Sequence, residues 1–226
     1  MIQSNLKESI LGEILETIKF ALFASGNGSN ALQILKRIND IGHKLECLIV
    51  DNPNAKIIEK WNHQSIPLYV IPFEKKYSTY QENKALHENK IIKKMEEHGV
   101  SWAVLAGYMR ILSEPLLKYF KDDTGVFKIL NIHPSLLPSF PGKNAIEDSF
   151  QYGVQVHGIT IHLVDEGVDS GPIIFQKSFE RNELSFEEYK NMTHSFEHLY
   201  YWKVIKNVFD GYQEKVFEKG EKWKNL

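Results

Sequence analysis

Asn131 and His133 are the residues of this chain best suited to chemistry, because they place an amide and an imidazole two positions apart. Side chains two residues apart in an extended strand leave the same face, so both would point into one cleft. Pro134 ends the strand directly afterwards, since proline cannot donate a ladder hydrogen bond. An amide donor beside a group that titrates near neutral pH suits acyl chemistry, in which an oxyanion is stabilised and a proton is moved. The competing interpretation is a strand end with an ordinary packed histidine.

A second chemical feature is the turn S-G-N-G-S-N at residues 25–30, which follows a short apolar run. The next helix would begin with the backbone amides of Gly28, Ser29 and Asn30. Free amides at a helix N-terminus favour an anion, and a phosphate is the most natural one. The competing interpretation is a tight strand-to-helix turn that binds nothing.

The same turn also allows a dinucleotide site. Gly26, Gly28 and Ala31 satisfy the pattern G-x-G-x-x-A, and Asp51 follows at about the distance at which an acidic residue would bind a ribose. A nicotinamide-dependent oxidoreductase is therefore an alternative function, although it leaves Asn131 and His133 without a role.

A third feature is the polar loop that ends the segment G-I-T-I-H-L-V-D-E-G-V-D-S-G-P at residues 158–172. Loops at the carboxyl ends of strands are where an open α/β sheet places its site. Asp169 is our choice for the partner of His133, since a nearby carboxylate favours the imidazolium and raises its pKa. We therefore expect a protonated His133 at neutral pH. Spacing alone does not choose between Asp169 and the neighbouring Asp165 and Glu166.

Composition excludes several classes of protein. The chain has 226 residues and a formal net charge of −2, which argues against nucleic-acid binding through bulk charge. Cys47 is the only cysteine, so a disulfide framework or a cysteine-rich zinc site is excluded. The sequence contains neither a secretory signal pattern nor an apolar run long enough to cross a bilayer, so we expect a cytoplasmic protein without a membrane partner.

Apolar strand-like runs alternate with amphipathic segments along the chain. This alternation predicts an α/β fold with a mainly parallel twisted sheet and helices on both faces. The expected strands are 20–24, 45–51, 68–71, 102–106, 126–132, 159–164 and 173–179. The expected helices are 30–38, 55–62, 83–98, 114–120, 145–152 and 185–210.

Residues 1–18 differ from the rest, because Ile10, Leu11, Ile14, Leu15 and Ile18 recur at helical spacing before the first strand. We interpret this segment as an amphipathic N-terminal extension with a packing or oligomer role. Residues 19–226 are expected to form a single domain.

Four motifs in order resemble the phosphoribosylglycinamide formyltransferases, folate-dependent enzymes of purine synthesis. They are residues 25–30, L-A-G-Y-M-R-I-L at 105–112, N-I-H-P-S-L-L-P-S-F-P-G at 131–142 and G-V-D-S-G-P at 167–172. The resemblance implies a Rossmann-like formyltransferase fold. It also implies that the formyl group of 10-formyltetrahydrofolate passes to the amine of a glycinamide ribonucleotide, without a metal or a covalent enzyme intermediate. The partners would be small molecules, and the protein a monomer or homodimer.

The resemblance assigns roles residue by residue. Asn131, His133 and Asp169 match the catalytic residues. The nucleotide would be bound by Gly28, Ser29, Asn30, His194 and Glu197. The folate would be bound by Met109, Arg110, Ile111, Leu112, Asn131, Asp165, Glu166, Gly167, Val168 and Asp169. A basic residue usually meets the glutamate tail of the folate, and this chain offers Lys75, Lys76 and Lys84 for it.

In the implied mechanism, Asn131 and protonated His133 stabilise the charge that builds on the formyl oxygen. Asp169 keeps His133 charged and helps to carry the proton of the amine to the leaving nitrogen. Arg110, beside an apolar pocket, would need a partner of its own.

Relatives of this family supply further alternatives. Formyltetrahydrofolate deformylase shares the centre but carries an N-terminal regulatory domain, for which the first nineteen residues are too few. Methionyl-tRNA formyltransferase adds a C-terminal RNA-binding domain, for which this chain is too short and too acidic. A non-catalytic folate or nucleotide module would not need all three polar groups. H-S-F-E-H at 194–198 also spells a zinc signature with His194 and His198 on one helix face, but no third ligand is evident.

Overall fold

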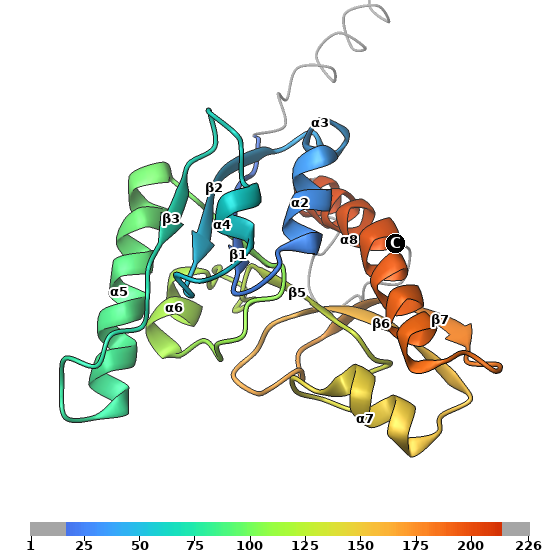
Figure 1. Cartoon of the computed structure of the whole chain (residues 1–226). Helices are drawn as coiled ribbons and strands as arrows, with labels where there is room; N and C mark the ends of the chain where they lie inside the picture. The colour runs from blue at the N-terminus through green and yellow to red at the C-terminus, as the bar shows by residue number, and fades with distance from the viewer. Residues whose placement is uncertain (1–16, 214–226) are drawn as a thin grey trace, which may run out of the picture.

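The computed structural model describes residues 17–213, so the expected extension at residues 1–18 falls almost wholly outside them. The strands are β1 (Lys19–Ala24), β2 (Lys44–Val50), β3 (Leu68–Val70), β4 (Trp102–Leu105), β5 (Ile129–His133), β6 (Val156–Leu163) and β7 (Ile173–Glu180). The helices are α2 (Ser29–Lys36), α3 (Ile38–Ile41), α4 (Ile57–Lys60), α5 (Tyr80–His98), α6 (Glu114–Tyr119), α7 (Ala145–Tyr152) and α8 (Phe186–Gln213) (Figure 1).

All seven strands form one sheet in the order β3-β2-β1-β4-β5-β6-β7. The five strands β3, β2, β1, β4 and β5 pair in parallel, whereas β6 pairs antiparallel with both β5 and β7. The connection between β6 and β7, residues 164–172, is too short for the helical crossover that a parallel pair needs, so these strands form a hairpin. The predicted α/β class with a mainly parallel sheet is confirmed.

Helices cover both faces of the sheet, as the alternation of apolar runs predicts. On one face, Phe20 and Leu22 of β1 pack in a core shared with α2 and α8, which lie side by side in Figure 1. On the other face, Ala21 and Phe23 pack against Ile91 of α5 and its neighbours. Alternate residues of a strand therefore belong to different cores, and both cores hold the sheet beneath the site.

Two predicted boundaries are wrong for identifiable reasons. Helix α5 begins at Tyr80 rather than at residue 83, because Thr79 and Glu82 form a capping box that satisfies the first amides of the helix. Strand β5 begins at Ile129 rather than at residue 126, because the Asp122 carboxylate accepts the Val126 N–H at 3.0 Å and holds that segment in a turn.

Two predicted helices are also shorter than expected. The predicted helix at 30–38 is interrupted at Arg37, where φ is −107°, and α3 follows as a separate turn. The helix expected at 55–62 is reduced to the single turn of α4. Within residues 17–213, no helix is long and apolar enough to cross a membrane. The division into an extension at 1–18 and one domain at 19–226 stays a prediction.

Candidate active site

A cavity of about 340 Å³ opens where β4, β5 and β6 end. Asn131, His133 and Asp169 line it, together with four residues that follow β4: Met109, Arg110, Ile111 and Leu112. Met109 and Ile111 are 68% and 59% exposed, so large apolar side chains stand at its mouth without protein partners to cover them. An apolar hollow with a few convergent polar groups is the usual form of a small-molecule site.

Asn131 is oriented by a histidine on the neighbouring strand. It pairs directly with His162 across β5 and β6, and its Nδ2 lies 3.2 Å from His162 Nε2. His162 Nδ1 donates to the Leu163 carbonyl at 2.8 Å, so Nε2 is left as an acceptor. Asp169 Oδ1, 3.4 Å from the same amide nitrogen, lies 3.6 Å from His162 Nε2. One N–H of Asn131 can serve both acceptors, and the other is left for a substrate oxygen.

His133 is 4% exposed, and both of its ring nitrogens face acceptors. Nε2 donates to the Phe140 carbonyl at 2.8 Å, while Nδ1 lies 3.3 Å from Asp169 Oδ2. A neutral imidazole has a single N–H, and the shorter of the two contacts, to the Phe140 carbonyl, assigns that hydrogen to Nε2. Nδ1 is then the basic nitrogen. Nδ1 is thus the atom at which this site can take up a proton.

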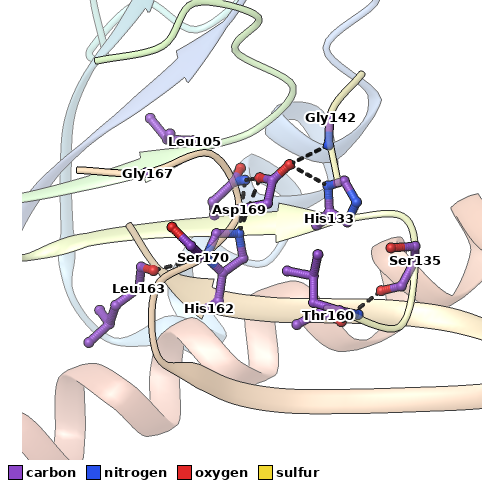
Figure 2. Close-up of polar contacts among 12 residues, drawn as sticks. Leu105, His133, Ser135, Gly142, Thr160, His162, Leu163, Gly167, Asp169 and Ser170 are labelled. Carbon is purple, nitrogen blue, oxygen red and sulfur yellow. Dashed lines mark hydrogen bonds and ion pairs between the residues drawn. The ribbon is translucent and has the colours of Figure 1, made fainter. Parts of the chain in front are cut away.

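Asp169 contacts both Asn131 and His133 through its two carboxylate oxygens. Figure 2 shows its contacts with His133 and Gly142. Asp169 Oδ2 also accepts the Gly142 N–H at 2.8 Å. The loop that carries Asp169 folds back tightly, because a Cβ at Gly171 would stand 1.9 Å from the Leu163 carbonyl oxygen. Asp169 itself has φ 52°, a left-handed conformation that is uncommon outside glycine and that clusters at functional sites.

The protonation expected for His133 is wrong for the substrate-free protein. Burial lowers the pKa of His133, and this effect exceeds the opposite effects of the Asp169 charge and the Phe140 carbonyl, so the pKa lies below its usual 6.5. The ring is therefore mainly neutral at pH 7. Burial raises the pKa of Asp169, but its contacts with His162 and Gly142, together with the charge that His133 carries at acid pH, outweigh burial and lower that pKa. Asp169 therefore raises the pKa of His133 as expected, but not enough to keep the ring protonated at neutral pH.

Arg110 has the partner that its position requires. Its Nε lies 2.6 Å from Asp51 Oδ2, and its guanidinium carbon stands 4.6 Å from the centre of the Phe73 ring. Asp51 is 5% exposed, and this ion pair occupies the carboxylate that a dinucleotide site would direct to a ribose. The pair therefore removes the main support for the oxidoreductase alternative.

The glycine turn and the last helix meet beside the cavity. Gly28 has φ 68° at the start of α2, and no side chain caps the first turn of this helix. Asn30 Nδ2 donates to Glu197 Oε2 of α8 at 3.1 Å. Burial raises the pKa of Glu197 to about 7, against the effect of the Asn30 hydrogen bond. A carboxyl group that titrates near neutral pH thus stands behind the glycine turn.

Ser25 joins this turn to the cavity. Its N–H donates to the Gly107 carbonyl at 3.0 Å, and its Oγ accepts the Met109 N–H at 2.9 Å. The two predicted binding segments are therefore directly hydrogen-bonded neighbours.

The structure places the predicted site residues in two neighbouring groups, one at the cavity and one at the glycine turn. Glu166 is exposed and does not line the cavity. His194 lies on α8 about one turn before Glu197 and does not line the cavity either. Asp165 lines the cavity, but its carboxylate accepts from Gly167 N–H and Ser170 Oγ of its own loop. In the described part of the chain, no group of three or more His, Cys, Asp or Glu residues could hold a metal ion, so the zinc alternative gains no third ligand.

Sequence reasoning missed His162, Lys143 and the Phe140 carbonyl, which all belong to the site or its border. His162 could have been noticed, because it lies in the same strand-like run as the polar loop. Its position opposite Asn131 depends on the register between β5 and β6, which no local pattern reveals.

The position of this cavity, at the carboxyl ends of mostly parallel strands, is that of an α/β enzyme site. An N–H donor beside a proton carrier suits acyl chemistry, in which an acyl group is transferred to an acceptor or to water.

Comparison with known proteins narrows this class. The model of the family described as "Formyl transferase" matches residues 18–205. Phosphoribosylglycinamide formyltransferase of Bacillus subtilis (strain 168) is 45% identical over 193 residues, which cover 84% of this chain and 94% of the relative. The trifunctional purine biosynthetic protein adenosine-3 of Gallus gallus is 37% identical over 71% of this chain, which matches 15% of that protein. The crystal structure of phosphoribosylglycinamide formyltransferase from Bacillus halodurans has a TM-score of 0.77 at 34% identity and covers 88% of this chain and 100% of that one.

The chain therefore belongs to the formyl transferase family, and it has the Rossmann-like fold of the phosphoribosylglycinamide formyltransferases.

Proposed function

We propose that this enzyme transfers the formyl group of 10-formyltetrahydrofolate to the amine of 5'-phosphoribosylglycinamide. The observation that carries the proposal is the contact of Asp169 with both Asn131 and His133 at the wall of one cavity. The 45% identical relative from Bacillus subtilis, which bears the name of this activity, supports it. The expected cytoplasmic location and the choice between monomer and homodimer stay predictions.

The chemistry follows from the geometry of the donors. The amine attacks the formyl carbon, and the carbonyl electrons move to the formyl oxygen. The free N–H of Asn131 stabilises this oxyanion, an effect typically worth about 3 to 4 kcal/mol. The carbonyl then re-forms as the bond from carbon to the folate nitrogen breaks.

His133 moves the proton in this scheme. Its neutral Nδ1 takes the proton of the attacking amine, directly or through one water, and the imidazolium later gives it to the leaving folate nitrogen. Asp169, ionised and 3.3 Å from Nδ1, stabilises the imidazolium between the two steps. The products are the glycinamide ribonucleotide formylated on its amine and tetrahydrofolate, with no covalent enzyme intermediate.

A spectrophotometric assay tests this function. The enzyme is incubated with 10-formyltetrahydrofolate in the presence and absence of glycinamide ribonucleotide. Formation of tetrahydrofolate that depends on the nucleotide supports transfer. Equal formation without the nucleotide would assign the deformylase activity instead, and the same assay with NADH measures the oxidoreductase alternative directly.

The anion-binding turn gives a prediction for the nucleotide. Valine at Gly28 is unsuitable as a probe, because a Cβ there would stand 2.4 Å from Ile57 Cδ1 and would damage the fold. Ser29 is exposed, so Ser29→Glu places a negative charge at the phosphate without a clash. We expect the KM for the nucleotide to rise about ten- to a hundredfold through charge repulsion, while the KM for the folate stays unchanged. Ser29→Gln is the matched neutral control, and an equal rise in both variants would contradict an anion site.

We infer that Lys84, rather than Lys75 or Lys76, is the lysine that meets the glutamate tail of the folate. Lys84 lies in a hollow with Arg110 and Ile111, directly beside the folate segment, whereas Lys76 Nζ pairs with Glu74 at 3.0 Å. We expect Lys84→Ala to raise the KM for a polyglutamylated folate about fivefold, the effect of roughly 1 kcal/mol from a partly exposed ion pair. Lys75 is exposed, and Lys75→Ala serves as the control that should leave this KM unchanged. A larger effect at Lys75, measured in parallel titrations, would reverse the assignment.

A further inference from the structure

Three neighbouring strands place His133, Thr160 and Gln176 in one row across the sheet. His133 of β5 pairs directly with Thr160 of β6, which pairs directly with Gln176 of β7. Directly paired residues of antiparallel strands project from the same face. Thr160 is fully buried, Gln176 is exposed, and neither lines the cavity.

Thr160 and Gln176 hold the loop that follows His133. Thr160 Oγ1 donates to the Ser135 carbonyl at 2.6 Å and accepts the Leu137 N–H at 2.9 Å. Gln176 Nε2 donates to both Thr160 Oγ1 and the Leu137 carbonyl, each at 2.9 Å. Figure 2 shows the contact between Thr160 and Ser135 beside the catalytic residues. Both backbone polar groups of Leu137 are thus satisfied by this pair of side chains.

The same loop returns to the ring of His133. Ser135 Oγ donates to the Ser139 carbonyl at 2.6 Å and lies 3.3 Å from the Phe140 carbonyl. Phe140 has φ 53°, a conformation that an aromatic residue adopts only where its surroundings hold it. Its carbonyl accepts His133 Nε2–H at 2.8 Å. The chain of contacts therefore ends on the atom that determines which nitrogen of His133 is basic.

We propose that Thr160 and Gln176 are positioning residues that hold the Phe140 carbonyl against His133 and so fix the tautomer of its ring. The proposal rests on the catalytic role proposed for His133. With the loop held, the hydrogen stays on Nε2, and Nδ1 is left without a hydrogen beside Asp169, which also lines the cavity. With the loop released, the ring loses its acceptor, and the hydrogen can move to Nδ1, where it blocks proton uptake.

Other groups also act on His133, and the test must leave them in place. The charge of Asp169 raises the pKa of His133, and the charge of His162 lowers it. His133 in turn contributes to the lowered pKa of His157, which also lies on β6. The Phe140 carbonyl raises the pKa of His133, so releasing the loop shifts its titration to lower pH. Substitutions at Thr160 and Gln176 remove none of these titratable groups.

The test compares Thr160→Val and Gln176→Met with wild type in kcat, in both KM values and in the tautomer of His133 measured by ¹⁵N NMR. We expect each variant to lower kcat about ten- to a hundredfold with little change in KM, and to convert the His133 signal from the Nε2–H form to a mixture. Thr160→Ser keeps the hydroxyl and should restore both readouts.

Thr193→Val is the matched control for stability. Thr193 is fully buried, and its Oγ1 donates to the Tyr189 carbonyl at 2.9 Å within α8. This variant should lower Tm as Thr160→Val does, yet keep kcat and the His133 signal of the wild type. If it lowers kcat as much as Thr160→Val, the effect is general destabilisation and the proposal fails.

A folded Thr160→Val or Gln176→Met variant with wild-type kcat and an unchanged tautomer would also overturn the proposal. If Thr160→Val does not fold, exposed Gln176→Met decides the question alone. A failure of the catalytic role proposed for His133 gives a different result from a failure of the positioning role. In the first case His133→Ala retains its turnover, whatever the variants at positions 160 and 176 do.

Discussion

Alanine in place of Asn131 or His133 is expected to lower kcat at least about a hundredfold while leaving both KM values nearly unchanged. Asn131 donates to charge that exists only in the transition state, and His133 moves a proton only during the reaction. Neither contribution is available to the bound ground state, so truncation should affect turnover far more than binding. Steady-state kinetics with each substrate varied in turn measure the separation.

Two controls make the expected loss specific. His63 is a histidine of the loop after α4 that contacts Ser65, and His63→Ala should keep wild-type kcat. The Tm of each variant shows whether the fold survives. Near-normal turnover in Asn131→Ala or His133→Ala would remove that residue from the proposed mechanism, whereas a parallel rise in KM would assign it to binding.

The local geometry of the site was readable from the sequence, because it depends only on the period of a strand. Asn131 and His133 were expected on one face of a strand, and both line the cavity from β5. The helix after the glycine turn was likewise expected from local signals. The capping box of Thr79 and Glu82 was equally local, so the start of α5 could have been predicted from T-x-x-E.

Contacts that depend on strand order and register could not be read locally. Asp51 follows β2, and Arg110 follows β4. These two strands lie on either side of β1 in the sheet, so the residues that follow them can meet above the end of β1. The pairing of Asn131 with His162 requires the register of β5 against β6. The sign of the His133 pKa shift was wrong for a related reason, since the sequence identified the carboxylate but not the depth of burial.

Asp169→Asn is expected to lower kcat about a hundredfold, within the range of general acid–base catalysis, and to move the acid limb of the kcat profile to lower pH. The sign follows from the charges on His133. Its pKa is already below 6.5 through burial, and the Asp169 carboxylate raises it, so removing that charge lowers it further. Because the neutral ring starts the reaction, activity should persist to lower pH although its maximum falls. Asparagine suits this position, since it tolerates the left-handed φ of 52°.

The kcat profile must be measured at saturating concentrations of both substrates, because Glu197 has a pKa of about 7 and would otherwise add the pH dependence of nucleotide binding. Exposed Asp148→Asn on α7 makes the same change of charge outside the cavity and should leave kcat and the acid limb unchanged. An Asp169→Asn enzyme with an unmoved acid limb would show that His133 is not the group that titrates. A limb that moves to higher pH would show that the buried carboxylate does not stabilise the imidazolium.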